Sequence, residues 1–178
     1  MTTTRRFQPE DLLRFNNVNL DKYTETYNQA FYLQYLAQWP EYFACSDAPD
    51  GRMMGYVMGK AEGRQRNWHG HVTAVTVAPE SRRLGLAGKL MHFLEDVSEN
   101  IHDGYFVDLY VRISNLAAIN MYKKLGYVIY RQVIGYYSGT EDAYDMRKAL
   151  PRDGPGKASE TPLDPLRVEP GVGAPSGD

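Results

Sequence analysis

The sequence predicts an α+β domain in which helices pack against a mostly antiparallel central sheet. Over residues 1–150, segments rich in β-branched and aromatic residues alternate with segments whose apolar residues recur at helical spacing. The pair Asp50-Gly51 stands between two strand-like segments and is typical of a tight hairpin between antiparallel strands. With 178 residues, 43% hydrophobic and 24% charged, the chain is long enough to bury its own core.

Seven segments have the composition of β-strands, because β-branched and aromatic residues dominate them and turn residues bound them. We expect strands at residues 4–7, 41–47, 53–60, 71–79, 105–111, 127–137 and 143–150. The strong turn signal between the second and third favours a hairpin and therefore antiparallel pairing, and the last two strands flank a polar loop, SGTED.

Four segments predict helices. The first begins at Pro9, whose fixed φ suits a first helical turn, and runs to residue 16. The second covers residues 31–39 and stops before Pro40. The third is long, residues 86–101, with leucines at a spacing of four. The fourth runs from Ser114, which can cap its start, to Gly126, which can terminate it.

The composition changes once, at about Pro151. Residues 151–178 are dense in Pro and Gly, almost without aromatic residues, and lack periodicity. Such a segment cannot offset its ordering entropy by burial. We therefore expect one domain at residues 1–150 and a disordered tail at residues 151–178.

Composition also excludes several functions. The net charge of −2 disfavours a nucleic-acid binder. A single cysteine, Cys45, cannot form a disulfide within the chain or a cysteine zinc site, and we expect it to be buried and inert and expect no metal. The N-terminus has no apolar signal segment, and no stretch approaches ~20 apolar residues. We expect no membrane association and a cytoplasmic location, with the nucleus as an alternative.

One informative segment is VAPESRRLGLAGKLM at residues 77–91, where a strand passes through a turn into a helix. Arg82, Gly85 and Ala87 form an R-x-x-G-x-A pattern at this junction. The free amides of the first helical turn, at the positive end of the macrodipole, can bind phosphate oxygens, and Arg82 and Arg83 would add charged contacts. The alternative is an ordinary helix start, with Gly85 for tight packing and the arginines in solvent.

A second informative segment is SNLAAINMYKKLGY at residues 114–127. Asn115, Ala118 and Tyr122 share a face at helical spacing. Asn115 could hold an amide-bearing ligand, Ala118 would leave room for it, and Tyr122 could present its hydroxyl in a cleft. The alternative is an amphipathic helix in which Tyr122 is a half-buried packing residue.

The two segments together resemble the GNAT acyltransferase superfamily. The stretches FNNVNLDKYTETY, FYLQYLAQWPEYF, MGYVMGKAEG, WHGHVTAVTVAPESRRLGLAGKLM, VDLYVRISNLAAINMYKKLGY and EDAYDMRKAL are similar to the catalytic subunits of NatB N-terminal acetyltransferases. The resemblance covers residues 1 to about 150. Gly135 departs from the family pattern, where a larger, often acidic residue is expected, and should loosen the last hairpin. Lys22 also departs and should make the substrate entry more basic.

The resemblance implies the GNAT acyltransferase fold, acetyl-CoA as co-substrate, and direct acetyl transfer in a ternary complex. Tyr122 would be the general acid for the coenzyme thiolate, and a backbone N–H near Val75 to Val77 would meet the thioester carbonyl. Glu25 and His71 are candidates for the base. The implied cofactor-binding residues are Val75, Val77, Arg82, Arg83, Gly85, Leu86, Ala87, Gly88, Asn115 and Tyr122.

The NatB resemblance further implies that the acceptor is a nascent protein N-terminus that begins Met-Asp, Met-Glu, Met-Asn or Met-Gln. Such a site needs an apolar pocket for Met and hydrogen-bond donors for the second side chain. The candidate substrate-binding residues are Leu20, Glu25, Tyr27, His71, Thr73, Tyr136 and Tyr137. For Tyr136 and Tyr137 the alternative is an ordinary aromatic strand end. The resemblance also implies a heterodimer with a large helical-repeat auxiliary subunit, which could bring the enzyme to the ribosome.

Two other functions remain open at this point. A GNAT enzyme that acetylates lysine side chains or other N-termini would have the same cofactor site and a different acceptor pocket. A non-catalytic GNAT module that binds acyl-CoA is a second alternative. The joint presence of Arg82, Gly85, Asn115 and Tyr122 argues against the second alternative.

Overall fold

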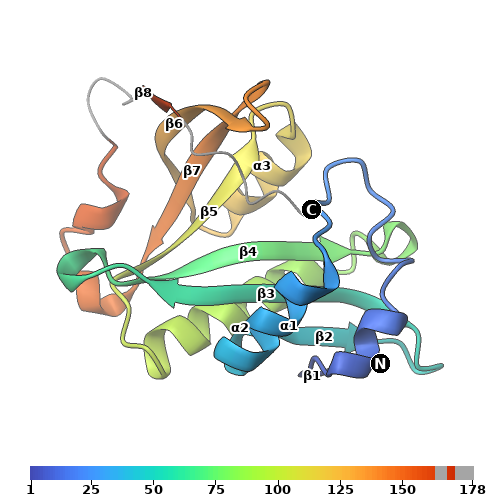
Figure 1. Cartoon of the computed structure of the whole chain (residues 1–178). Helices are drawn as coiled ribbons and strands as arrows, with labels where there is room; N and C mark the ends of the chain where they lie inside the picture. The colour runs from blue at the N-terminus through green and yellow to red at the C-terminus, as the bar shows by residue number, and fades with distance from the viewer. Residues whose placement is uncertain (163–167, 171–178) are drawn as a thin grey trace. The chain divides into compact units, whose positions relative to one another are not determined.

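The computed structural model describes residues 1–162 and 168–170. These residues form two compact units, and the predicted α+β class is confirmed within them. The first unit comprises Met1–Ala61 and Val72–Val97, and the second comprises Glu62–His71 and the described part of the chain from Ser98 onward. Figure 1 labels the helices and strands.

The first unit contains four strands in the order β1-β2-β3-β4. Their bounds are β1 Thr3–Arg6, β2 Ala44–Asp47, β3 Met53–Glu62 and β4 His69–Val77, with the last residue of β3 and the first three of β4 assigned to the second unit. The predicted hairpin at Asp50-Gly51 joins β2 and β3, which pair antiparallel. Gly51 has a φ of 83° in this turn, a conformation that glycine adopts without strain.

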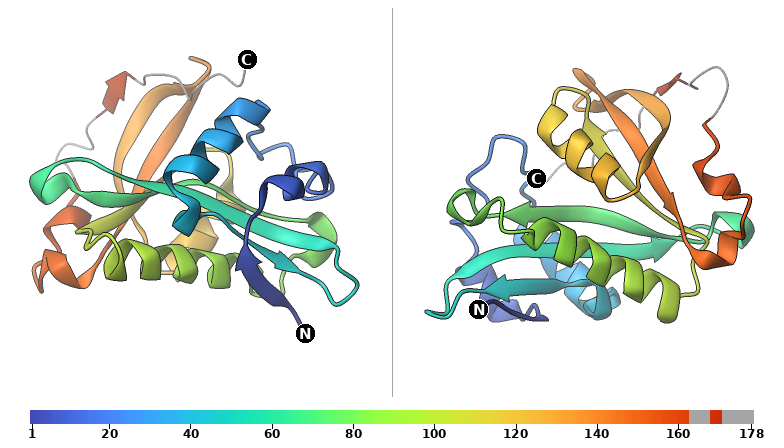
Figure 2. Two further views of the ribbon diagram at one scale, coloured as in Figure 1. Left: turned by 60° about the horizontal axis from the view of Figure 1, so that its bottom comes forward. Right: turned by 180° about the vertical axis from the view of Figure 1, so that it is seen from behind.

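Two helices cover the strands of the first unit. They are α1 at Gln29–Gln38 and α2 at Leu86–Asn100, and they lie on opposite faces of the strands (Figure 2). Residues 53–59 of β3 are all buried, because both faces of this strand are covered. An aromatic cluster fills the core, including Phe7, Phe15, Tyr32, Phe43 and Tyr56.

The helix predicted at residues 9–16 is instead a 3-10 helix over Pro9–Leu13. Leu12, Phe15 and Val18 are all buried, at a spacing of three residues. Phe15 and Val18 lie beyond the 3-10 helix, in a loop and turn, so the chain leaves the helix after Leu13 and still buries both side chains. The turn is also held by the carboxylate of Asp11, which accepts from the Gln8 backbone N–H at 2.8 Å. Core packing therefore decides the local conformation here.

The strand predicted at residues 41–47 begins later than expected. Pro40–Tyr42 form a 3-10 turn, and β2 starts at Ala44. Pro40 stands at the first position of the turn, where its fixed φ is favourable. The turn brings Tyr42 and Phe43 into the core, where both are fully buried.

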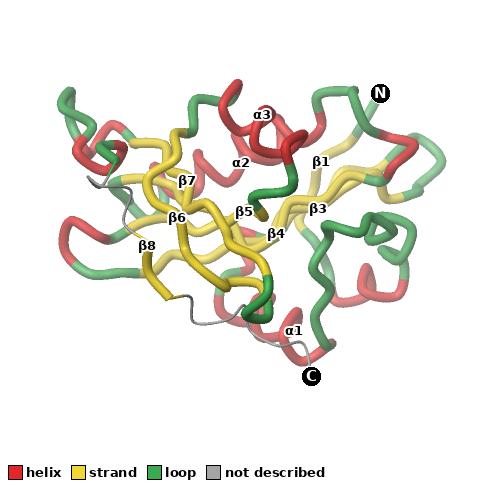
Figure 3. The backbone as a smooth tube through the Cα atoms, turned by 90° about the horizontal axis from the view of Figure 1, so that it is seen from above, coloured by secondary structure: helices red, strands yellow, loops and turns green. Residues whose placement is uncertain are grey.

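The second unit contains α3 at Leu116–Lys124 and four strands in the order β5-β7-β6-β8. The strands are β5 Phe106–Arg112, β6 Val128–Tyr137, β7 Glu141–Ala149 and β8 Val168–Pro170. β7 pairs antiparallel with both β5 and β6, and β8 pairs parallel with β6 (Figure 3). β5 therefore pairs with β7 rather than with β6, the next strand along the chain.

Gly135 coincides with an interruption of the last hairpin, as expected from its departure from the family pattern. The register of β6 against β7 shifts between Val133 and Tyr137. Gly135 has a φ of 64°, which a larger residue adopts only with strain, and its N–H donates to Asp142 Oδ1 at 2.9 Å. β6 leaves the regular ladder with β7 here, but the hydrogen bond from the Gly135 N–H to the Asp142 side chain on β7 replaces the missing ladder contact.

The first residues of the predicted tail have defined structure, in contrast to the expected disorder. Two 3-10 turns occur at Pro151–Asp153 and Ala158–Glu160. The carboxylate of Glu160 accepts from the backbone N–H of Ala149 in β7 at 2.8 Å. Hydrogen bonds to the preceding strand supply a stabilisation that composition alone does not reveal. The rest of the predicted tail, residues 163–167 and 171–178, lies outside the described residues.

Candidate functional site

The turn that carries R-x-x-G-x-A lies in the first unit, between β4 and α2. The first α2 hydrogen bond runs from the N–H of Lys89 to the carbonyl of Gly85 at 3.1 Å. The amides of residues 86–88 precede it and have no intrahelical acceptor. Gly85 has a φ of 75°, and a Cβ atom added there would meet nothing within 4 Å. Gly85 is therefore needed for the backbone conformation and not for tight packing, which contradicts the packing alternative.

Arg82 is exposed but not simply solvated. Its Nη2 donates to Asp21 Oδ2 at 2.6 Å, and its Nε donates to the Val77 carbonyl at 3.3 Å. The Tyr23 backbone N–H, together with the Arg82 guanidinium, holds the pKa of Asp21 below its usual range. Arg82 thus links the turn to the loop before α1, whereas Arg83 is exposed at a φ of 64°.

The loop before α1 carries three of the predicted substrate residues. Leu20 is 73% exposed, and Glu25 and Tyr27 are half-buried. The Tyr27 ring stacks on Phe31 with centroids 4.2 Å apart. Tyr27 also lines a cavity of about 530 Å³. The other lining residues are Leu12, Phe15, Asn16, Asn19, Thr26, Gln29 and Tyr32. The first unit thus offers an aromatic-walled cavity at this loop, and Leu20 and Glu25 are not among its lining residues.

The predicted positions on β4 alternate as expected for a strand. Thr73, Val75 and Val77 are half-buried, whereas Val72 and Thr76 are buried. The Thr73 hydroxyl donates to the Tyr35 hydroxyl at 2.8 Å. A substrate that contacted the Thr73 hydroxyl would therefore share it with Tyr35 of α1. Of the remaining turn residues, Leu86 is buried and Ala87 and Gly88 are half-buried.

Asn115 caps α3, a position that the sequence assigned to Ser114. The Asn115 Oδ1 accepts from the Ala118 backbone N–H at 3.2 Å. Ser114 is instead engaged by its hydroxyl with the Glu141 carboxylate. Both residue types are good N-caps, so local sequence does not distinguish them, and the ion pair of Glu141 with Arg112 decides the arrangement. Gly126 has a φ of 96° and ends the helix as predicted.

Tyr122 lies on the buried face of α3, and only 8% of the residue is exposed. Its ring contacts the Tyr127 ring edge-on with centroids 6.0 Å apart. Its hydroxyl has no hydrogen-bond partner among the described residues, yet is not one of the fully buried unsatisfied polar atoms. Burial raises the pKa of Tyr122 well above its usual value, so the hydroxyl stays protonated at neutral pH. This O–H is available to donate to a ligand.

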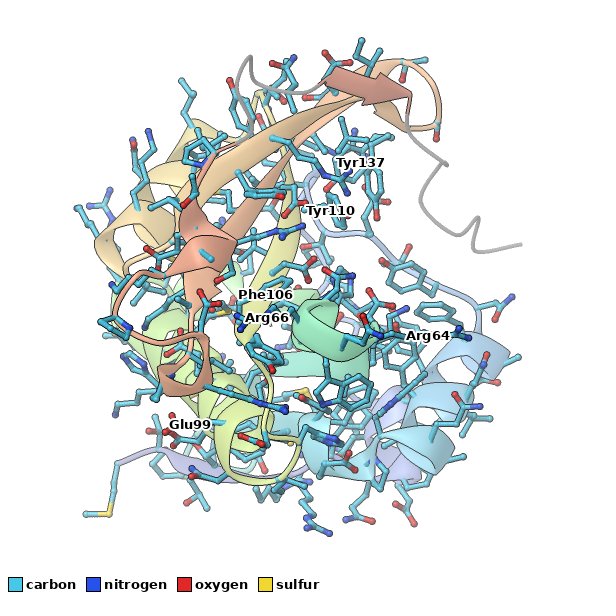
Figure 4. The ribbon with its side chains drawn as sticks, turned by 90° about the vertical axis from the view of Figure 1, so that its left-hand side faces the viewer. Arg64, Arg66, Glu99, Phe106, Tyr110 and Tyr137 are labelled. Atoms are coloured by element: carbon cyan, nitrogen blue, oxygen red, sulfur yellow. The ribbon has the colours of Figure 1, made fainter. Side chains whose placement is uncertain are left out.

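Tyr136 and Tyr137 differ in their surroundings. Tyr136 is half-buried and stacks on Tyr110 with centroids 4.6 Å apart. Tyr137 is buried, its hydroxyl donates to the Tyr110 carbonyl at 3.2 Å, and Arg112 lies 4.1 Å above its ring (Figure 4). The surroundings of Tyr137 favour the aromatic strand end over a substrate donor, since its only O–H is already used.

His71 lies against a buried carboxylate that the sequence analysis missed. Its Nδ1 is 2.7 Å from Oδ1 of Asp108, and His69 Nε2 is 3.3 Å from the other oxygen of this carboxylate. Burial alone would raise the pKa of Asp108, but the two histidines outweigh it and hold the pKa well below its usual range. The signal in the sequence was an acidic residue inside the apolar strand FVDLYV. Cys45 is buried, as predicted, and burial raises its pKa to about 12.

Within residues 1–162 and 168–170, no group of three or more His, Cys, Asp or Glu side chains could hold a metal ion. None of the helices in this part of the chain is long and apolar enough to span a bilayer.

Comparison with known proteins agrees with this geometry. Residues 12–127 match the Acetyltransferase (GNAT) family. The Arabidopsis thaliana N-terminal acetyltransferase B complex catalytic subunit NAA20 is 63% identical over 153 residues, which cover 86% of this chain and 88% of that protein. The crystal structure of Chaetomium thermophilum Naa20 with a bisubstrate analogue has a TM-score of 0.86 at 43% identity, covering 94% of this chain and 95% of that one.

A structure of the NatB acetyltransferase complex bound to CoA and MES has a TM-score of 0.77 at 46% identity, covering 84% of this chain and 99% of that one. The turn before α2 in the first unit and α3 in the second unit carry the two motifs on which the resemblance to GNAT enzymes rests. The chain belongs to the GNAT acetyltransferase family. Within that family it is a protein N-terminal acetyltransferase that uses acetyl-CoA, and its relatives are NatB catalytic subunits. The predicted fold, enzyme class and co-substrate are therefore confirmed.

Proposed function

We propose that this catalytic subunit transfers acetyl from acetyl-CoA to the α-amine of protein N-termini that begin Met-Asp, Met-Glu, Met-Asn or Met-Gln. The observation that carries the proposal is the 63% identity to a NatB catalytic subunit over 86% of the chain. The candidate acceptor residues lie in the loop before α1, in β4 and in β6. The acceptor preference is the part that needs a direct test.

The cofactor would bind at the start of α2. Its pyrophosphate oxygens would accept from the unpaired amides of residues 86–88, with added attraction from Arg82 and Arg83. Arg82 can serve in this way only by sharing its guanidinium with Asp21, which it contacts at 2.6 Å. The pantetheine arm would reach Asn115, whose Oδ1 is the helix cap and whose amide N–H₂ can donate.

The chemistry requires a neutral amine and a stabilised leaving thiolate. An α-amine has a pKa near ~8, so most of it is protonated at neutral pH and must lose a proton before attack. Direct transfer in a ternary complex gains from holding the amine near the thioester carbon. The Tyr122 hydroxyl would donate to the thiolate, since it stays protonated and makes no other hydrogen bond among the described residues. His71 and Glu25 remain the candidates for the base.

The acceptor pocket would use the aromatic wall of the loop before α1 for the Met side chain. Tyr27 contributes its stacked ring, with Leu20 as an exposed apolar neighbour in the same loop. Tyr136, half-buried and with its ring ordered by Tyr110, is the stronger tyrosine candidate for a donor to the second side chain. A donor in this role rejects side chains that cannot accept a hydrogen bond.

We also propose that the protein works as a heterodimer with a helical-repeat auxiliary subunit in the cytoplasm, where nascent chains emerge. α1 is a candidate dock, since Leu33 on its outer side is 45% exposed. The auxiliary subunit would then supply any contact with the ribosome.

A peptide panel tests the proposal. Acetyl transfer is measured with and without the auxiliary subunit on peptides that begin Met-Asp, Met-Glu, Met-Asn, Met-Gln, Met-Leu and Ser, and on an N-blocked peptide with an internal lysine. Preference for the first four supports the proposal. Preference for the blocked lysine peptide, or for Met-Leu or Ser, would replace it with a different acceptor class.

A further inference from the structure

Three polar side chains of the second unit gather near one buried carboxylate, that of Asp108 on β5. They are His69 and His71 on β4 and Glu62 at the end of β3, and with Asp108 we call them the Asp108 cluster. Asp108 is 3% exposed and His69 is 6% exposed, so charge in this cluster is balanced mainly by its own members. Phe106 and Tyr110 flank Asp108 along β5 (Figure 4).

The surroundings of His69 favour its positively charged form. Its Nδ1 lies 2.5 Å from the carbonyl oxygen of Asn67, which only accepts, so Nδ1 carries a hydrogen. Its Nε2 forms no hydrogen bond among the described residues but lies 3.3 Å from Asp108 and 3.6 Å from Glu62. Two carboxylates at these distances favour a proton on Nε2 over a bare lone pair. Burial lowers the pKa of His69, but the carboxylates outweigh it and raise this pKa to about 10.

The contacts with His71 and His69 keep Asp108 ionised. An ionised carboxylate only accepts hydrogen bonds, so the contact of 2.7 Å between Asp108 Oδ1 and His71 Nδ1 requires the hydrogen to be on the histidine. In neutral His71 the other ring nitrogen, Nε2, then carries the lone pair. No described residue forms a hydrogen bond with this Nε2, and 11% of the side chain remains exposed.

We propose that Asp108 is a positioning residue that fixes His71 in the tautomer whose Nε2 accepts, and that His69 holds Asp108 in its ionised form for this purpose. This rests on the proposed function, because it selects His71 over Glu25 as the base for the α-ammonium. It also excludes neutral His71 as an N–H donor to the second side chain of the substrate, since its one hydrogen is bound to Asp108.

The proton balance of the step is simple. The α-ammonium gives one proton to His71 Nε2, directly or through one water, and the imidazolium formed is opposed by Asp108 and later returns the proton to solvent. The neutral amine attacks the thioester carbon, and the C–S bond breaks as the amide bond forms. Tyr122 donates its hydroxyl proton to the leaving thiolate. The second proton of the attacking nitrogen then replaces it on Tyr122. One acetyl group moves and one proton is released overall.

Several charged groups surround His71 and Asp108 and must be considered in any pH dependence. Glu62 Oε1 is 4.0 Å from His71 Nδ1, and the Tyr110 ring centroid is 5.7 Å from that of His71. Beyond β5, the buried carboxylate of Asp145 on β7 repels Asp108, but it is paired with Arg131 and Arg147 at 2.9 and 3.2 Å. These arginines compensate Asp145, so the groups that face Asp108 most closely are His71 at 2.7 Å and His69 at 3.3 Å.

Nitrogen-15 NMR of the full-length protein tests the proposal without any assay of activity. Long-range proton–nitrogen correlations distinguish the two neutral tautomers, and loss of signals in the His71→Gln variant assigns the ring. We expect His71 protonated at Nδ1 and unprotonated at Nε2, and His69 protonated at both nitrogens near pH 8. A His71 hydrogen on Nε2, or a neutral His69 at that pH, would overturn the proposal.

Kinetics give the second readout. Asp108→Asn should lower kcat for a Met-Asp peptide by roughly 10-fold to 100-fold and shift the acidic limb of the kcat profile, while the Kd for acetyl-CoA stays within about twofold. His92→Gln, an exposed histidine on α2, is the matched control and should leave kcat unchanged. A folded Asp108→Asn enzyme with wild-type kcat at every pH would refute the positioning role.

The failure of this proposal is distinguishable from failure of the proposed function. If the wild-type enzyme ignores Met-Asp peptides, the acceptor assignment fails, and the tautomer measured by NMR still decides the role of Asp108. If Asp108→Asn does not fold, the tautomer of His71 in the wild-type protein decides alone.

Discussion

Replacing Tyr122 with Phe removes one hydroxyl and leaves the ring in place, which makes it a direct test of the proposed chemistry. The hydroxyl has no hydrogen-bond partner among the described residues, and burial raises its pKa so that it remains a donor. If it stabilises the leaving thiolate, we expect turnover to fall by about 10²-fold. This corresponds to ~2.7 kcal/mol of transition-state stabilisation, at ~1.36 kcal/mol per factor of ten.

The same substitution should have little effect on stability. No hydrogen bond within the described residues is lost, and the edge contact with the Tyr127 ring at 6.0 Å is retained. We expect the free energy of unfolding to change by less than ~0.5 kcal/mol, or about 2 °C in Tm.

Tyr56→Phe provides the contrasting control, because it removes a hydroxyl that is in use. The buried Tyr56 hydroxyl donates to Asn19 Oδ1 at 2.7 Å, so its loss should cost about 1 kcal/mol of stability. Turnover should stay close to that of the wild type.

The assay combines three measurements on both variants in complex with the auxiliary subunit. Single-turnover acetyl transfer to a Met-Asp peptide reports the chemical step, calorimetry reports the Kd for acetyl-CoA, and thermal unfolding reports stability. Full turnover in Tyr122→Phe would refute the role of general acid. A Tm lowered by more than ~5 °C would show that the hydroxyl stabilises the fold, and any fall in turnover would then have a structural explanation.

Three further predictions concern charge and the end of the chain. Asp21→Asn removes the anionic partner of Arg82 and should tighten acetyl-CoA binding about twofold to threefold at low salt, by calorimetry; an unchanged Kd would show that Arg82 does not reach the cofactor. The pKa of His69 is raised from 6.5 to about 10 on folding, so its stabilisation is complete below pH 6.5 and is lost as the pH rises through 10. In urea titrations between pH 6.5 and 10, the free energy of unfolding of His69→Gln should therefore fall less than that of the wild type. An equal fall in both proteins would contradict the charge assigned to His69. Deleting residues 151–178 removes the Glu160 hydrogen bond to β7 and should lower Tm by about 3 °C with one cooperative transition; a broad transition would indicate a larger structural role for this segment.

Features set by a few adjacent residues could be predicted from the sequence. The hairpin at Asp50-Gly51 and the left-handed glycine Gly126 at the end of α3 are both present as expected. The R-x-x-G-x-A turn also follows from local chemistry, since Gly85 adopts a φ of 75° where a helix begins. In these places the conformation depends on backbone sterics within a few residues, so the local sequence is enough to predict it.

Local patterns failed where distant packing decided between two acceptable conformations. The segment after Pro9 has helical composition, yet it forms a 3-10 helix only to Leu13, and the buried residues Phe15 and Val18 follow in a loop and turn. Ser114 and Asn115 are both good caps, and the engagement of Ser114 with Glu141, 27 residues later, leaves the capping position to Asn115. The residues that settle these choices are far away in the chain.

The sequence by itself determined the class of fold and the conformation of the turn at Gly85, because strand patterns and turn chemistry are local properties, and its resemblance to a known family gave the enzyme class. The order β5-β7-β6, the covered hydroxyl of Tyr137 and the Asp108 cluster were decided only by tertiary structure. Asp108 and His71 are 37 residues apart and meet only in the folded chain. A hydrogen bond depends on distance in space. Strand pairing brings together residues that are far apart along the chain, so their separation in the sequence does not predict the contact.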